Sequence, residues 1–168
     1  DIEALGHRPV VQDLLSLTRA LSHPDDRLAW LAVLRAPWCG LKLVDLEALA
    51  GSDAKRAVWD LMNDDPRVSA LSADGRARLT RVRAVLQACL DDRCRGSLRA
   101  RVAGAWFAIS GPACVEDTTD LEDAEIYFDY LESHGMRRIS KRLIASGALE
   151  VVATAVPGMK DILVLGKV

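Results

Sequence analysis

Arginine side chains concentrated in one segment are the residues best suited to bind an anion. Eight arginines, no lysine and two acids lie between positions 76 and 101. The planar guanidinium group binds phosphate or carboxylate oxygens through two parallel hydrogen bonds. Contacts of this kind to the backbone of a nucleic acid are independent of base sequence and weaken as salt rises. We therefore take Arg78, Arg81 and Arg83 as candidate DNA contacts.

An acidic segment gives the same arginines a different partner. Between Glu116 and Glu132 there are eight acids and no basic residue. Two neighbouring helices of opposite charge would attract one another, and the arginines would then pair within the protein across a solvated surface. The sequence does not choose between a phosphate backbone and the protein's own acidic helix, so both interpretations stay open.

The remaining reactive side chains form no recognisable catalytic or metal-binding motif. Four cysteines are present, at positions 39, 89, 94 and 114, and no pair of them has the C-x2-C spacing of a zinc site. Adjacent acids such as Asp25 and Asp26 are more often helix caps than metal ligands. The sequence contains no phosphate-binding loop, no dinucleotide fingerprint and no G-x-S-x-G motif. We expect no catalytic residue, no metal ion and no cofactor in this chain.

The composition is typical of a globular protein. The chain has 168 residues, of which 50% are hydrophobic and 27% charged, with a net charge of −2. A net charge so close to zero argues against a protein that coats nucleic acid, although it leaves local basic patches open. No apolar stretch approaches the roughly 20 residues that span a bilayer, and the cysteines suggest a reduced, cytoplasmic setting. Both ends resemble cuts within a longer polypeptide.

Apolar residues recur at three- and four-residue steps through most of the chain, which is the spacing of amphipathic helices. Asp25 or Asp26 is expected to cap the second helix, the run 63–66 to close the fourth, and Gly135 to separate the last two. The predicted fold class is mainly α, with about eight helices. Their expected ranges are 9–21, 26–35, 43–50, 53–62, 73–90, 97–109, 119–134 and 137–145.

The end of the chain has a different character. The runs 150–156 and 162–165 are rich in β-branched residues and are separated by Pro157 and Gly158, a turn signal. They predict a short β element, either a strand pair or one strand with a loose end. We assign 1–147 to one helical domain and treat 148–168 as a separate tail.

The order of several short motifs resembles that of UvrD/Rep-type superfamily 1 DNA helicases. Residues 6–30 resemble the stretch where the second RecA-like domain gives way to the inserted helical subdomain called 2B, with Arg8 and the run 23–26 at matching positions. Later pieces resemble RecB-like ATP-dependent exonucleases, and the resemblance covers about residues 2–135. Those pieces are 34–41, 104–113 and 119–125.

The resemblance implies a 2B-like accessory subdomain that orients duplex DNA ahead of RecA-like motor domains of the same polypeptide. ATP and Mg²⁺ would be bound by those motor domains. The turn 37–41 matches the place where related helicases present a glycine-containing turn to DNA, which makes Gly40 and Lys42 candidate contacts. Arg8 could contact DNA within an intact motor. The T-x-H-x-x-K-G-L-E-F motif expected after the subdomain is missing from 147–168, and a return of this tail toward a RecA-like domain is one interpretation.

The expected function is therefore a non-catalytic accessory part of an ATP-dependent DNA helicase or exonuclease. Its expected partners are DNA, bound weakly and without sequence preference, and the motor domains, with no membrane involved. The alternative is a helical protein-interaction or regulatory module with no DNA role, whose acidic and basic helices dock partners.

Overall fold

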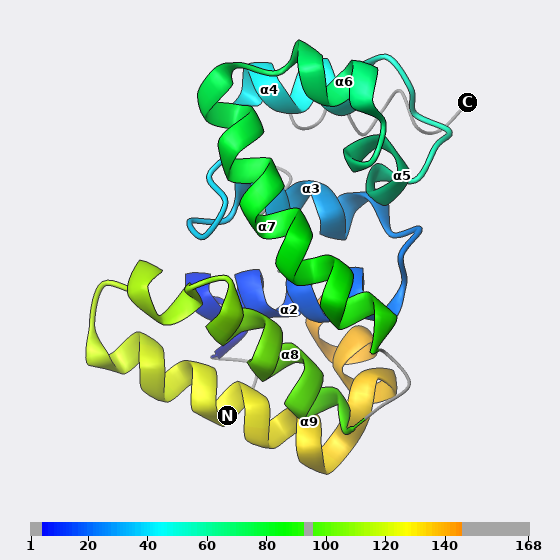
Figure 1. Ribbon diagram of the computed structural model, residues 1–168. Helices are drawn as coiled ribbons and strands as arrows, with labels where there is room; N and C mark the ends of the chain where they lie inside the picture. Colours follow the sequence, from blue (N-terminus) through cyan, green and yellow to red (C-terminus); the bar gives the residue numbers. More distant parts are fainter. Residues whose placement is uncertain (1–4, 93–95, 146–168) are drawn as a thin grey trace.

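All regular elements among the described residues, 5–92 and 96–145 of the computed structural model, are helices, which confirms the mainly α fold class (Figure 1). No helix in these ranges is both long enough and apolar enough to cross a membrane. The elements follow one another as α2 (Pro9–Ser22), α3 (Arg27–Arg35), α4 (Leu43–Leu46), the π-helical turn η1 (Glu47–Gly51), α5 (Val58–Met62), α6 (Asp65–Ala70), α7 (Ala73–Asp91), α8 (Leu98–Ala108), the 3₁₀ turn η2 (Gly111–Cys114) and α9 (Thr118–Ala145).

Short polar side chains start several of these helices. The Asp26 carboxylate accepts a hydrogen bond from the N–H of Ala29 at 3.0 Å and begins α3. The Ser72 hydroxyl accepts from the N–H of Gly75 at 3.0 Å and begins α7. Such caps satisfy N–H groups that have no partner inside the helix. Of the two predicted caps, Asp25 and Asp26, the structure thus uses Asp26.

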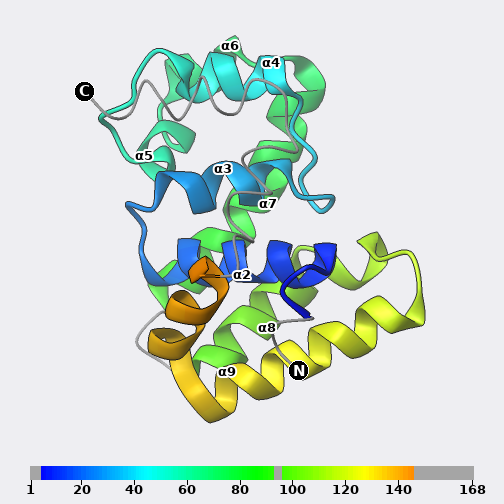
Figure 2. The same cartoon turned by 180° about the vertical axis from the view of Figure 1, so that it is seen from behind.

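Helix α2 lies at the centre of the molecule. It contacts α3 on one side and α8 and α9 on the other, and α7 crosses it (Figure 1, Figure 2). The helices α4, α5 and α6 lie beyond α3, at the end of the molecule opposite α9. This arrangement puts the turn between α3 and α4 beside the long helix α7.

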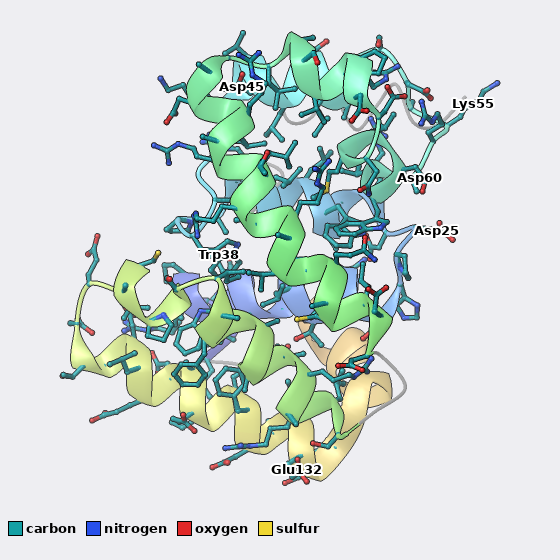
Figure 3. The ribbon with its side chains drawn as sticks, in the orientation of Figure 1. Asp25, Trp38, Asp45, Lys55, Asp60 and Glu132 are labelled. Carbon is teal, nitrogen blue, oxygen red and sulfur yellow. The ribbon has the colours of Figure 1, made fainter. Side chains whose placement is uncertain are left out.

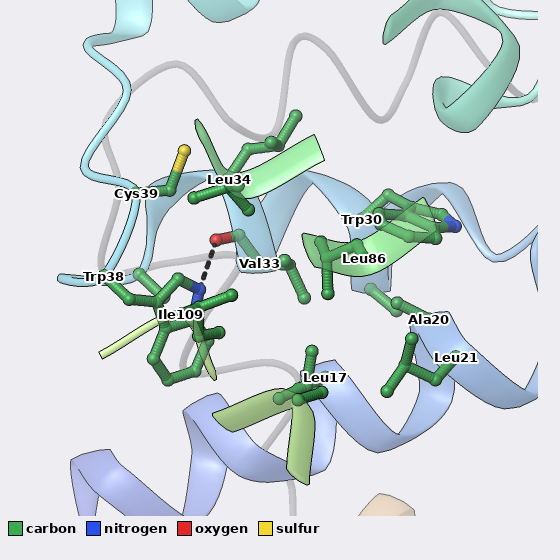
Figure 4. Close-up of a cluster of buried hydrophobic side chains, with 14 of the residues drawn as sticks. Leu17, Ala20, Leu21, Trp30, Val33, Leu34, Trp38, Cys39, Leu86 and Ile109 are labelled. Atoms are coloured by element: carbon green, nitrogen blue, oxygen red, sulfur yellow. Dashed lines mark hydrogen bonds between the residues drawn. The ribbon is translucent and has the colours of Figure 1, made fainter. Parts of the chain in front are cut away.

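The core follows α2 and α3 (Figure 4). Leu17, Leu34 and Leu86, from three different helices, are fully buried in it. The indole N–H of Trp38 donates to the carbonyl oxygen of Val33 at 3.0 Å, so this buried polar group is satisfied. Truncating a buried leucine to alanine typically costs about 2–5 kcal/mol, so these side chains dominate the stability of the domain.

The prediction of a helix over 53–62 is wrong in its first half, because α5 begins only at Val58. The Asp53 carboxylate accepts hydrogen bonds from the N–H groups of Lys55 and Arg56, at 3.2 and 3.1 Å, which holds a turn in place of a helical start. Side chains of aspartate compete with helix formation in this way.

The predicted end of this helix at the run 63–66 is confirmed, because α5 ends at Met62 with Asn63 as its C-cap. A further helix that the sequence did not predict, α6, begins within the same run. Pro66 lies in the first turn of α6, where its missing N–H has no helical partner to lose. The Asp64 carboxylate accepts from the N–H of Arg67 and caps this additional helix.

Two further boundaries differ from expectation. The helix expected over 43–50 gives way after Leu46 to the π-helical turn η1. Gly135 does not separate two helices, since the backbone of α9 is helical from Thr118 to Ala145. A single glycine costs a helix only about 1 kcal/mol relative to alanine, which a long helix tolerates. The predicted β element and the tail 148–168 lie outside the described residues.

Candidate nucleic-acid interface

The turn that carries Gly40 is held by backbone hydrogen bonds. The N–H groups of Cys39 and Gly40 both donate to the carbonyl oxygen of Ala36, at 2.9 and 2.8 Å. Gly40 has a φ of +63°, a backbone conformation that favours glycine. A Cβ at this position would also lie 3.1 Å from a guanidinium nitrogen of Arg78. The glycine therefore allows both the turn and the close approach of an arginine.

Two arginines of α7 hold this turn from outside. Arg78 donates through Nη1 to the carbonyl oxygen of Cys39 at 3.3 Å and through Nε to Asp74 at 2.8 Å. Arg81 donates to the carbonyl oxygen of Trp38 and, at 3.4 Å, to that of Ile109. The side chain of Arg78 stays 44% exposed, and a guanidinium group has five N–H donors. Part of each donor set therefore remains open to an external anion.

Lys42 adds a free cation next to the turn. Its side chain is exposed and forms no hydrogen bond or ion pair with any described residue. It precedes α4, which has only four residues and is too short to add a useful helix dipole. The attraction that Lys42 offers an anion is therefore that of its ammonium group alone.

We call Gly40, Lys42, Arg78 and Arg81 the basic turn. Three of these residues are cations, and the acid that contacts them is Asp74, which is already paired with Arg78. The nearby carboxylate of Asp45 is 2% exposed and accepts hydrogen bonds from Ser72. The surface therefore has a local positive charge in a protein whose net charge is −2.

Arg83 lies apart from the basic turn. Its Nη1 donates to the carbonyl oxygen of Met62 at 2.8 Å, at the end of α5. The structure thus brings together four of the six predicted DNA contacts and directs Arg83 toward a different part of the molecule.

Arg8 also has a structural partner. Its guanidinium group donates to Asp123 at 2.6 Å and to Asp120 at 3.2 Å, which ties the start of α2 to α9. The hydrogen bond and charge of Asp123 raise the pKa of Arg8 above its ordinary value. Acidic side chains surround Arg8, so its setting differs from that of the basic turn.

The acidic segment pairs with other arginines than those of the basic turn. Arg99 of α8 lies 3.3 Å from Glu125 and 3.4 Å from Asp129. These side chains are partly exposed, and exposed ion pairs contribute little to stability. Pairing with the acidic segment is therefore found for Arg99 and, outside the arginine-rich segment, for Arg8. Contact of Arg78 and Arg81 with DNA stays a prediction.

The hydrogen-bond partners of most of the α7 arginines were not predicted from the sequence. Arg76, Arg81 and Arg83 all donate to main-chain carbonyl oxygens at the ends of neighbouring elements. The one available signal is general: carbonyl groups at helix ends and turns need donors from outside the element.

The basic turn has the chemistry of an anion-binding surface. It contains no acid–base pair and no nucleophile, and among the described residues no three His, Cys, Asp or Glu side chains meet closely enough to hold a metal ion. Comparisons of the chain with known protein families, with curated proteins and with solved structures find no match.

Proposed function

We propose that this chain is a non-catalytic accessory domain that holds duplex DNA through phosphate contacts at the basic turn. The observation that carries the proposal is the placement of Lys42 and of the open N–H groups of Arg78 and Arg81 around one rigid turn. The guanidinium groups of Arg78 and Arg81 are held by hydrogen bonds, so they approach phosphate oxygens without first losing much side-chain freedom, and the exposed Lys42 adds its charge.

The strength of the expected binding follows from the small number of cations. Non-specific protein–DNA affinities lie at roughly 10⁻⁴–10⁻⁶ M at physiological salt, and each neutralised phosphate contributes about 0.9 to the slope of log K against log salt. Three cations therefore predict binding at the weak end, with a slope of about −2 to −3. No preference for base sequence is expected, since phosphates carry no base identity.

The wider role that we propose is that of the 2B-like subdomain of a UvrD/Rep-type ATP-dependent helicase or exonuclease acting in DNA unwinding and repair. The support for it is the resemblance of residues 2–135 together with the helical fold. In such a protein the motor domains bind ATP and Mg²⁺, and this domain orients the duplex that they pull.

The test is Lys42→Ala, with Lys55→Ala as its matched control. Both lysines are exposed and neither side chain bonds to a described residue, so both variants lose one charge without losing a contact. Lys55 lies on the far loop between η1 and α5 (Figure 3). Titrations of a fluorescent duplex at several salt concentrations measure affinity and salt slope, and thermal melts check the fold.

We expect Lys42→Ala to weaken binding several-fold and to reduce the salt slope by about 0.9, whereas Lys55→Ala leaves both unchanged. Equal losses in the two variants would show that only net charge matters and would contradict a site at the basic turn. Absence of binding by the unaltered protein would favour the alternative, a protein-interaction module.

A further inference from the structure

Helix α8 is apolar on the side that faces solvent as well as on the side that faces the core. Its buried residues are Val102, Ala105 and Trp106. Ala100, Gly104 and Phe107 follow one another at steps of four and three positions, so they share the opposite face, and all three are exposed. We call these three residues the outer face of α8. A helix that is apolar all round is typically buried all round, yet the described residues leave this face uncovered between α7 and α9 (Figure 1).

Phe107 is the largest side chain of the outer face. It is 58% exposed, although its ring lies 5.5 Å from that of the buried Trp106. Exposed aromatic side chains next to other apolar residues are common where proteins bind one another, and aromatic residues supply much of the binding energy there.

A groove lies between α8 and α7 beside the outer face. Its volume is about 390 Å³, and small apolar residues form most of its wall, among them Ala88 of α7 and Ala100 and Gly104 of α8. Its two charged residues, Asp92 and Arg101, have opposite signs. A Cβ added at Gly104 would meet nothing within 4 Å, so the space above this residue is open. The groove can therefore accept apolar side chains of a partner.

Acidic side chains of α9 border the outer face on its other side. Glu122, Glu125 and Asp129 are exposed and lie three and four positions apart, so they form one row along α9. Arg99 of α8 lies 3.3 Å from Glu125 and 3.4 Å from Asp129, which shows that the row runs alongside α8. Three acids and one cation leave this border with a net negative charge.

The two borders select the class of partner. Complementary charges steer association and exclude partners of the same sign, so the acidic row disfavours a nucleic acid and an anionic membrane surface. An apolar face beside a row of acids matches a helix that has an apolar stripe with cations along one edge. Helices of this kind bind grooves through side chains at helical spacing.

We propose that the outer face of α8 binds a cationic amphipathic helix of another polypeptide. Phe107 and the groove beside it contact the apolar stripe of that helix, and Glu122, Glu125 and Asp129 contact its cations. This surface is separate from the proposed DNA surface, because none of these residues belongs to the basic turn.

The probe is a fluorescent lysine–leucine peptide of about 14 residues, whose leucines follow the spacing of an amphipathic helix. A peptide of the same composition in permuted order lacks the apolar stripe, and a third peptide has glutamate in place of lysine. Fluorescence anisotropy measures the affinity of each. We expect the first peptide to bind at least tenfold more tightly than either of the others. Equal binding of the permuted or the glutamate peptide, or no binding of the first, would overturn the proposal.

Gly104→Gln tests the outer face, and Ala77→Gln is its matched control. The new side chain at position 104 occupies open space, so it obstructs a partner without disturbing the fold. Ala77 is exposed near the start of α7, whereas the groove lies near the end of that helix. We expect about a tenfold loss of peptide binding in Gly104→Gln and none in Ala77→Gln, with thermal melts to check the fold. Unchanged binding in Gly104→Gln would overturn the proposal.

The acidic row is tested by the double variant Glu125→Gln/Asp129→Asn. Its matched control is Asp25→Asn/Asp60→Asn, which removes two exposed acids from the α2–α3 turn and from α5 (Figure 3). Exposed ion pairs contribute little to stability, so loss of the contacts to Arg99 leaves the fold intact. We expect the first variant to bind the lysine–leucine peptide more weakly and with less dependence on salt, and the control to bind it normally. Equal losses in both would show that net charge alone matters and would overturn the proposal.

Analytical ultracentrifugation of the protein without peptide tests whether a second copy covers the outer face instead. We expect a monomer at the concentrations of the titrations. Self-association that Gly104→Gln abolishes would assign the face to a second copy and would overturn the proposal.

Discussion

Arginine acts in this protein mainly as a donor to main-chain carbonyl groups. Arg27 shows the pattern best, since its two terminal nitrogens donate to the carbonyl oxygens of Ala50 at 2.6 Å, Asp53 at 3.1 Å and Arg56 at 3.3 Å. Arg27 therefore fixes the loop between η1 and α5 together with Arg67, which donates to the Ser52 hydroxyl at 3.1 Å and lies 3.6 Å from the Asp53 carboxylate. Lysine has a single donor nitrogen and cannot reproduce such a fork.

At the same scale, the hydrogen bond between Thr18 and Tyr127 predicts that removing its donor and removing its acceptor cost different amounts of stability. The Thr18 hydroxyl donates to the carbonyl oxygen of Leu14 at 2.7 Å, so the buried Tyr127 hydroxyl must be the donor in its 2.9 Å contact with Thr18. Tyr127→Phe removes this donor and leaves Thr18 bonded, so we expect a loss of about 1 kcal/mol in the free energy of unfolding.

Thr18→Val leaves the buried Tyr127 hydroxyl without its acceptor, and we expect a loss of about 1–3 kcal/mol. Urea denaturation of both variants measures the difference. A larger loss for Tyr127→Phe than for Thr18→Val would contradict the assigned direction of the hydrogen bond.

At the scale of the element, the helix starts that depend on neighbouring residues agree with the sequence prediction. The apolar spacing and the cap at Asp26 involve residues within a few positions of one another, and α3 and α7 begin at or within one residue of the predicted starts, 26 and 73. The failures involve distant partners or competing local turns. Arg27 reaches the carbonyl groups of a loop more than twenty positions away, and apolar spacing contains no information about such contacts.

At this scale we predict opposite changes in stability when two glycines within helices are replaced by alanine. Replacing a helical glycine by alanine normally stabilises the helix by about 1 kcal/mol. A Cβ at Gly75 of α7 would lie 2.6 Å from the carboxylate of Asp45, whereas a Cβ at Gly104 of α8 would meet nothing within 4 Å. We therefore expect Gly75→Ala to lower the melting temperature and Gly104→Ala to raise it.

The matched pair separates helix propensity from packing. If both variants were stabilised, Asp45 would be free to move away, which would contradict the tight hydrogen bonds that it accepts from Ser72.

At the scale of the whole molecule, the candidate sites are products of packing. The sequence supplies Gly40 and Arg78 as separate candidates, but their approach depends on how α7 lies across the turn, which Leu79, Val82 and other buried residues of α7 decide.

The isolated chain is expected to neither bind nor hydrolyse ATP. Phosphoryl transfer needs a phosphate-cradling loop and residues that hold Mg²⁺, and the sequence contains no such loop. A coupled ATPase assay with and without duplex DNA measures this directly. Turnover that DNA stimulates would contradict the role of an accessory domain.

The central position of α2 has a consequence for how the chain folds as it is made. Its partners Tyr127 and Asp123 lie 109 and 115 positions after the residues that they bond, Thr18 and Arg8. Native contacts so distant in sequence form late and slow folding, because a long loop must close before they are gained. During synthesis, α2 therefore emerges before these partners and keeps one apolar face uncovered until α9 has left the ribosome. We expect aggregation during expression to start from this helix.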